Sequence, residues 1–193
     1  MNSDNIILTL FSNPATVFTT AEISQLFPKV PHRNLLNRLG SYVKTGKLVR
    51  LRNGLYAKQN ASLLEAAGKL YAPSYISLET VLAETGIIFQ HAETAFAVSY
   101  LSREITLAIG TVHYFRIKES VLHNSEGVTQ GVGYAIATPE RAFLDTIWIY
   151  KDYHFDTLSV LNWEKIWEIL PIYESPTMIR RVKRYFKERS TNA

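Results

Sequence analysis

The sequence contains no cysteine among its 193 residues. A disulfide framework, a thiol nucleophile and thiolate-bound zinc or iron–sulfur centres are therefore excluded. No stretch reaches the roughly 18 consecutive apolar residues that a membrane span needs, and the amino terminus shows no basic region followed by an apolar run. These absences predict a cytoplasmic protein with no membrane partner.

Motifs of common enzyme classes are also missing. The chain has no Gly-x-Ser-x-Gly elbow and no phosphate-binding Gly-Lys-Ser/Thr loop, and Gly131-x-Gly133 lacks the third glycine of a dinucleotide loop. The histidines do not show the spacing of a metal site on one helix: His32, His91, His113, His123 and His154. We therefore expect neither catalysis nor a cofactor nor a metal.

Acidic residues are absent between Glu22 and Glu65, where the chain carries eight basic side chains. The segment Ile23 to Leu64 has a net charge of +8 and Pro176 to Ala193 one of +5, which leaves −9 for the remainder of a chain whose total is +4. A segment whose charges are all positive favours binding to a polyanion, because Lys and Arg displace counterions from duplex phosphates. The alternative is a solvated basic face.

The first 60 residues show the pattern of a small helical module. Apolar residues at helical spacing from Ile6 to Phe11 predict a first helix that ends before Pro14. Thr19 and Glu22 have the spacing of a capping box for a second helix, which Pro28 stops.

A third helix is predicted between Pro31, in its first turn, and Gly46, just past its end. Its apolar stripe consists of Leu35, Leu36, Leu39 and Val43. The opposite side carries residue types that read base edges or hold phosphates, namely Arg33, Asn34, Asn37, Arg38, Ser41 and Lys44. This is the face expected of a recognition helix in a major groove.

A hairpin is predicted to follow, with strands 47–51 and 55–58 and a type I′ turn at Asn53-Gly54. Arg50 and Arg52 lie near its tip, where they are expected to contact a phosphate backbone or enter a minor groove. Residues 1–60 are thus predicted to form a DNA-binding winged helix-turn-helix domain. A small winged helix used for protein–protein contact is the alternative.

Residues 61–193 are predicted to form a larger α+β domain. A helix over 61–70 precedes a second one, which Ser77 is expected to cap and Gly86 to end. A mostly antiparallel sheet of about four strands follows, over 95–101, 105–109, 111–118 and 133–137. Three further helices are predicted to start at Thr138-Pro139, Asn162 and Ser175-Pro176.

The last helix separates its residues into two faces. One is apolar and comprises Met178, Ile179, Val182, Tyr185 and Phe186; the other is basic and comprises Arg180, Arg181, Lys183, Arg184 and Lys187. The basic face has two interpretations, a solvated cover and a second nucleic-acid contact. A membrane-surface helix fits less well, because docking on the protein explains the apolar face.

Three segments in this order resemble the AbiEi-type antitoxins of bacterial type IV toxin–antitoxin systems. They are Gly46 to Ala57, which is similar to that family's wing, Pro73 to Thr80 before a short helix that ends at Gly86, and Ala137 to Asp145. The resemblance implies a winged helix that binds operator DNA and represses its own operon, and a second domain required for antitoxin action. It also implies a nucleotidyltransferase-like toxin as the functional partner, opposed without a stable complex.

The same segments also have structural interpretations. Glu79 would lie in the first turn of a helix, where negative charge is favourable, and Arg141 with Asp145 would form an i,i+4 pair. Structural roles are also expected for Glu140. Two functions remain open at this point: a sequence-specific repressor and antitoxin, or an interaction module that binds a protein or RNA without operator specificity.

Overall fold

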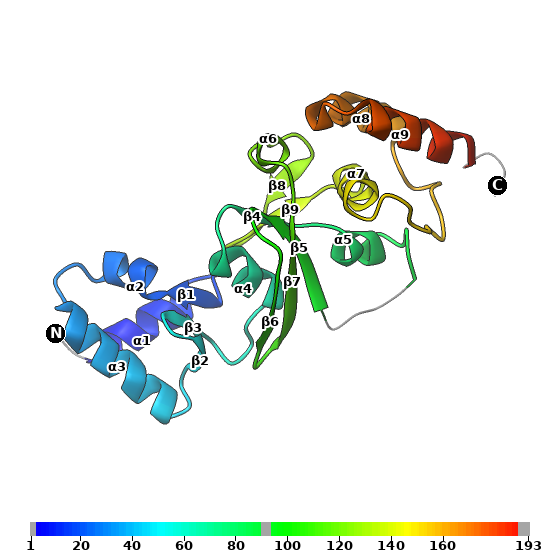
Figure 1. Ribbon diagram of the computed structural model, residues 1–193. Helices are drawn as coiled ribbons and strands as arrows, with labels where there is room; N and C mark the ends of the chain where they lie inside the picture. Colours follow the sequence, from blue (N-terminus) through cyan, green and yellow to red (C-terminus); the bar gives the residue numbers. More distant parts are fainter. Residues whose placement is uncertain (1–2, 90–93, 189–193) are drawn as a thin grey trace.

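The computed structural model describes residues 3–89 and 94–188, and its helices and strands form an elongated series of layers (Figure 1). His91 and Arg189, which contribute to the histidine and charge patterns of the sequence, lie outside the described residues. The chain has a mixed α+β architecture, as predicted. Within the described ranges, every helix is too short or too polar to cross a lipid bilayer.

The first 60 residues, called here the amino-terminal module, combine helices with a small antiparallel sheet. The helices are α1 (Ser3–Ser12), α2 (Thr20–Leu26) and α3 (His32–Lys44), and the strands are β1 (Val17–Thr19), β2 (Val49–Arg52) and β3 (Leu55–Ala57), in the order β1-β3-β2. Strand β1 was not predicted. It has only three residues, too few for an alternating pattern, and its partner β3 is distant in sequence.

Local signals in this module are largely confirmed. Thr19 Oγ1 accepts a hydrogen bond from the Glu22 N–H at 3.1 Å, and the Glu22 carboxylate accepts one from the Thr19 N–H at 2.7 Å, which completes the capping box. Gly46 has a φ of +69° just beyond α3, as a helix-ending glycine requires. Pro31 occupies the N-cap position of α3 instead of its first turn.

The turn of the β2–β3 hairpin differs from the prediction. Gly54 has a φ of +78°, whereas Asn53 is not among the described residues with positive φ, so the turn is not type I′. Strand β2 instead shifts register between Arg50 and Arg52, opposite Tyr56 and Leu55. This bulge adds the strand twist that a type I′ turn would otherwise supply.

The rest of the chain is built around a larger sheet. Its strands are β4 (Ser74–Ile76), β5 (Thr94–Ser99), β6 (Arg103–Leu107), β7 (Gly110–Arg116), β8 (Val128–Gln130) and β9 (Ala135–Ala137). The helices are α4 (Leu63–Leu70), α5 (Glu79–Glu84), α6 (Glu119–Leu122), α7 (Pro139–Ile149), α8 (Trp163–Ile169) and α9 (Pro176–Glu188), with the 3-10 turn η1 (Leu170–Tyr173).

The predicted four-stranded, mostly antiparallel sheet is corrected to a mixed sheet of six strands within the described residues, in the order β6-β7-β5-β4-β9-β8. The β5–β7 and β4–β9 pairs are parallel and the others antiparallel. Strands β4 and β8 were missed because three residues carry no readable alternation. The pairing order was not predictable, since β7 inserts between β5 and β6 and local sequence does not encode that choice.

Both faces of the small sheet are covered. Phe18 and Tyr56 pack in the cluster formed with α1 to α3, whereas the alternate residues Val17, Leu55 and Ala57 join the core of the rest of the chain. Helix α4 lies between the two sheets, α5 and α7 cover the far side of the larger sheet, and α8 and α9 lie beyond α7 (Figure 1). The amino-terminal module therefore packs against the second part through a shared apolar layer.

Of the four helix starts predicted in the second part, three are confirmed, including that of α9 at Pro176, and one is wrong. Thr138 caps α7, and the Asn162 side chain accepts hydrogen bonds from the first turn of α8. Ser77 does not cap α5, whose N-cap is Leu78 with a φ of +56° and no side-chain cap. The Ser77 hydroxyl is instead buried and donates to Asp145 at 2.8 Å.

Candidate nucleic-acid interface

Helix α3 is held by three buried side chains. Leu35 and Leu39 are completely buried, and Tyr42 is 7% exposed. Leu36 does not belong to this stripe, contrary to expectation, because 38% of it is exposed. Tyr42, which was not assigned to the apolar stripe, is buried with Leu35 and Leu39.

The opposite face of α3 is open to solvent. Arg33, Asn34, Asn37, Ser41 and Lys44 are all exposed, while Arg38 is half-buried at the edge of the face. Guanidinium and amide groups on one exposed helix face can make paired hydrogen bonds to base edges. The structure thus places five of the six predicted recognition residues on an accessible surface.

The two arginines of the β2–β3 hairpin have different surroundings. Arg50 is exposed, and its guanidinium lies 5.5 Å from the centre of the Tyr56 ring. Arg52 is exposed and lies close enough to the Tyr71 hydroxyl of the second part to lower the pKa of that tyrosine. Arg52 therefore lies near the junction between the hairpin and the part of the chain that follows it.

Lys58 belongs to the basic run of the sequence but not to its exposed surface. Only 8% of the residue is exposed, and its ammonium donates to the carbonyl oxygens of Phe11 at 3.2 Å and Asn13 at 2.6 Å. These carbonyls end α1, which leaves them without partners inside the helix. Lys58 therefore has a structural role, and one of the eight charges is removed from the candidate interface.

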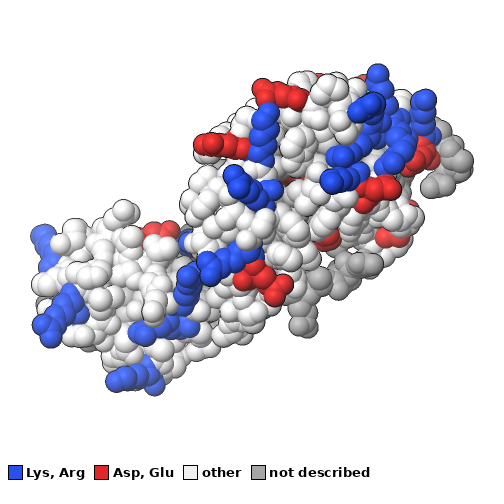
Figure 2. Space-filling model, in the orientation of Figure 1, with Lys and Arg blue, Asp and Glu red and all other residues white. Residues whose placement is uncertain are grey.

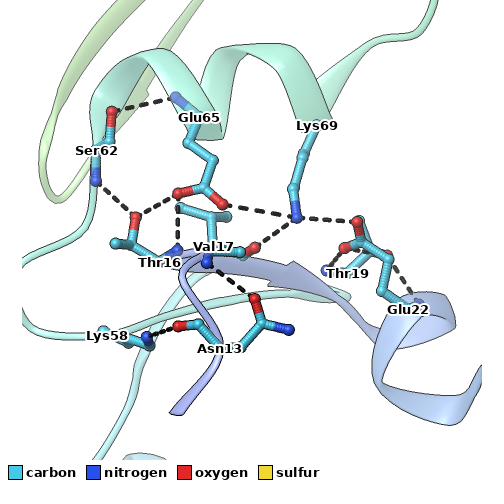
Figure 3. A network of polar contacts seen from close by, with 10 residues as sticks. Asn13, Thr16, Val17, Thr19, Glu22, Lys58, Ser62, Glu65 and Lys69 are labelled. Atoms are coloured by element: carbon cyan, nitrogen blue, oxygen red, sulfur yellow. Dashed lines mark hydrogen bonds and ion pairs between the residues drawn. The ribbon is translucent and has the colours of Figure 1, made fainter. Parts of the chain in front are cut away.

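A polar network joins β1 to α4 at the junction between the module and the second part (Figure 3). The Glu65 carboxylate, which is 2% exposed, accepts hydrogen bonds from the N–H and hydroxyl of Thr16 at 2.8 and 2.5 Å. The Lys69 ammonium donates to the Val17 carbonyl at 2.6 Å and to Glu22 at 2.9 Å. These directional bonds, together with the shared apolar layer, define the orientation of the module.

A second polar cluster lies inside the larger domain and is centred on Asp145. One carboxylate oxygen accepts hydrogen bonds from the hydroxyls of Tyr75 at 2.9 Å and Ser77 at 2.8 Å, and the other accepts from Tyr173 at 2.6 Å. Burial, followed by the charge of Asp145, raises the pKa of both tyrosines well above the usual value, so they remain protonated donors.

Arg141 completes this cluster, and its side chain is fully buried. Its guanidinium donates to the Tyr75 hydroxyl at 2.9 Å, to the carbonyls of Val121 at 2.7 Å and Glu126 at 2.6 Å, and to Asp145 at 3.4 Å. The predicted i,i+4 pair is thus confirmed.

None of the side chains at the centre of this cluster is more than 3% exposed, which closes it to ligands in this conformation. It joins α7 to β4, η1 and the segment around α6. Two of the sequence segments that carry the family resemblance, Pro73 to Thr80 and Ala137 to Asp145, therefore meet in one structural cluster. Sequence reasoning paired Arg141 with Asp145 but missed Tyr75, Ser77 and Tyr173, which are distant in the chain.

Helix α9 presents its basic face at the end of the molecule opposite α3 (Figures 1 and 2). Lys183 and Lys187 are exposed, and Arg180 is exposed with a hydrogen bond to Thr177. Arg181 is half-buried and donates to the Ile147 carbonyl at 2.9 Å, so it fastens α9 to α7.

Arg184 is exposed and pairs with Asp152 at 2.5 Å. The predicted apolar stripe is confirmed for Met178, Val182 and Tyr185 but not for Ile179, 43% of which is exposed. The basic face is therefore narrower than predicted, since Arg181 and Arg184 have partners within the protein.

Neither a scan against protein-family models nor a search of curated proteins finds a match to this chain. Within the described residues, no group of three or more His, Asp or Glu side chains is arranged to hold a metal ion.

Proposed function

We propose that the amino-terminal module is a winged helix that binds operator DNA, with α3 as the recognition helix and the β2–β3 hairpin as the wing. The observation that carries this proposal is the exposed face of α3, in a segment without a single acidic residue between Glu22 and Glu65. An α-helix with its side chains is about 10–12 Å in diameter, which fits a major groove about 12 Å wide, and the thirteen residues of α3 extend about 20 Å.

The seating of the module supports sequence-specific binding. Leu35, Leu39 and Tyr42 anchor α3 against the small sheet, and the Glu65 and Lys69 network fastens that sheet to α4. Base readout depends on side chains held in a defined orientation, because a displaced donor loses its acceptor. Arg50 at the hairpin is suited to phosphate contact, which positions the helix without specifying sequence.

We further propose that the protein is the antitoxin of a type IV toxin–antitoxin system and represses its own operon. Support comes from the resemblance of three segments to AbiEi-type antitoxins, two of which form the buried cluster around Asp145. The functional partner would be a nucleotidyltransferase-like toxin, opposed without a stable complex. Basic surfaces at both ends of the molecule suit a dimer on paired half-sites or a single molecule across adjacent turns of DNA.

Titration of the full chain against two duplexes tests the DNA-binding proposal. One duplex contains the region upstream of the protein's own gene and the other is a random sequence of equal length. We expect at least about 1000-fold tighter binding to the first, with affinity falling steeply as salt rises. Equal binding to both would favour the alternative, an interaction module for a protein or RNA. Co-expression with the product of the neighbouring gene tests antitoxin action separately.

Replacing Arg50 or Arg52 with alanine is expected to weaken binding to operator and to random duplexes about equally. Loss of Arg50 should lower the magnitude of the slope of log K against log salt by about 1, because one phosphate contact is lost. Loss of Arg52, which lies beside the Tyr71 hydroxyl, should lower it by no more than that. Fluorescence anisotropy at several salt concentrations measures this slope. A lost preference for one base pair with an unchanged slope would show that the hairpin reads sequence.

Reversing Arg180, Lys183 and Lys187 to glutamate tests the basic face of α9. These side chains are exposed and, unlike Arg181, are not bonded to the core, so each change should alter stability by no more than about 0.5 kcal/mol. If they contact DNA, the salt slope falls by about 1 for each contact. A variant that folds, binds operator like the parent and still neutralises the toxin would identify the face as a solvated cover.

A further inference from the structure

A groove of about 740 Å³ lies on the second part of the chain, at the ends of β5 and β7. Two aromatic side chains, Tyr100 and Trp148, and three basic ones, Arg116, Lys118 and His123, contribute to its lining. Its volume lies within the roughly 300–1,000 Å³ typical of small-molecule sites. Nothing in the operator proposal uses this groove.

The aromatic rings of the groove are supported from behind. Tyr100 is 48% exposed, and its ring packs edge-to-face on Tyr71 with centroids 6.3 Å apart. Trp148 is half-buried, and its ring lies 5.6 Å from that of Tyr173. Rings held in place but still accessible provide a stacking surface that loses little conformational entropy when a flat ligand binds.

The basic side chains supply the charge for an anionic group. Arg116 is exposed, and no hydrogen-bond or ion-pair partner for its guanidinium is found in the described part of the chain. Lys118 forms an ion pair with Glu174, and both side chains are exposed, so the pair contributes little and can open for a ligand. Glu119 is the only carboxylate among the residues that line the groove, all of which are described.

A basic path leads from the groove toward the hairpin. The Tyr71 hydroxyl accepts a hydrogen bond from Arg103 at 3.4 Å, Arg52 lies near enough to lower the pKa of that hydroxyl, and the Tyr71 ring contacts Tyr100. Figure 2 shows Lys and Arg side chains near the boundary between the amino-terminal module and the second part, on the face that it draws. A polyanionic strand seated in the groove would therefore meet further cations along its course.

We propose that this groove binds a nucleotide unit whose base is unpaired, either a free nucleotide or part of a single strand. The base would stack on Tyr100 and Trp148, and Arg116 and Lys118 would bind the phosphate. Exposed aromatic rings beside cations are the features with which proteins hold single strands, whereas the bases of a duplex are stacked on one another and present no free face. The proposal is independent of operator binding.

Titration of the full chain with UTP and with 5′-phosphorylated hexauridine, followed by calorimetry and tryptophan fluorescence, tests the proposal. Tyr100→Ala and Arg116→Gln are each expected to weaken binding about 10-fold, because each removes one stacking or phosphate contact. Lys165→Gln removes an exposed charge on α8, outside the groove, and should leave affinity unchanged. Trp148→Phe should retain binding and lose most of the fluorescence quenching.

Each outcome has a definite meaning. Similar affinities for UTP and hexauridine would identify a free nucleotide as the ligand, and binding of hexauridine alone would identify a single strand. The proposal fails if neither probe binds, or if Tyr100→Ala and Arg116→Gln bind the probes as the parent does while circular dichroism shows them folded. It also fails if these variants lose as much affinity for the operator duplex as for the probes, because the groove would then be part of a duplex contact.

Discussion

Replacing Asp145 with alanine is expected to lower the free energy of unfolding by about 3–5 kcal/mol. The change would leave the Arg141 guanidinium buried without its carboxylate partner and remove the acceptor for the hydroxyls of Tyr75, Ser77 and Tyr173. Buried donors that lose their acceptor keep the full cost of desolvation, which makes this penalty larger than that for an exposed ion pair. Urea denaturation followed by circular dichroism measures the loss.

Asp152→Ala is the matched control. Asp152 also pairs with an arginine, Arg184, but 81% of its side chain is exposed, so the expected loss is at most about 1 kcal/mol. If Asp145→Ala proves too unstable to study, Tyr173→Phe removes a single hydroxyl donor and should cost about 1.5–3 kcal/mol. Equal effects of Asp145→Ala and Asp152→Ala would contradict the assignment of the buried cluster as a main source of stability.

Arg33→Ala and Asn37→Ala are each expected to weaken operator binding by about 1–3 kcal/mol and to relax specificity at one base pair. Both side chains lie on the exposed face of α3, opposite the buried Leu35 and Leu39, so the fold should not change. Arg38→Ala, which alters a half-buried side chain, is expected to reduce binding as well but to need a stability control.

Titration against operator and random duplexes distinguishes a loss of sequence specificity from a general loss of DNA affinity caused by the removed charge. Lys165→Ala, at an exposed position on α8, serves as the control for removing one positive charge from the protein surface. Unchanged operator affinity for all three α3 variants would rule out α3 as the recognition helix. It would indicate that the module binds another kind of partner.

Features that depend on neighbours in the chain were predictable from sequence. The Thr19 and Glu22 capping box, the cap at Thr138 and the left-handed glycine after α3 each involve residues within four positions of one another. The polar face of α3 was likewise readable, since helical periodicity alone places Arg33 and Asn37 opposite Leu35 and Leu39. The alternation of the β2–β3 hairpin was visible, although its turn type was not.

Features that depend on distant residues were not predictable. Strands β1, β4 and β8 have three residues each and are defined only by their partners. Ser77 is a residue type that often caps helices. Its hydroxyl instead donates a hydrogen bond to the buried Asp145 carboxylate, and a hydrogen bond to a charged acceptor is stronger than the neutral one that a serine cap accepts from a helix N–H group. Lys58 and Arg181 were predicted to be surface charges. In the structure each donates hydrogen bonds to backbone carbonyl oxygens, which lie in segments distant from it in the sequence.

Local sequence thus contains the α+β character, most helix boundaries and the residues of the candidate DNA-reading face, because capping, periodicity and charge act over one or two turns of chain. The sharing of one apolar layer by both parts of the molecule, the six-stranded pairing order and the buried cluster around Asp145 arise only when distant segments meet, as those of Tyr75 and Tyr173 do around Asp145. So does the groove between Tyr100 and Trp148, whose rings are contributed by separate elements. Burial of apolar surface and the pairing of buried polar groups choose among many arrangements of the same helices and strands, and that choice depends on the whole chain.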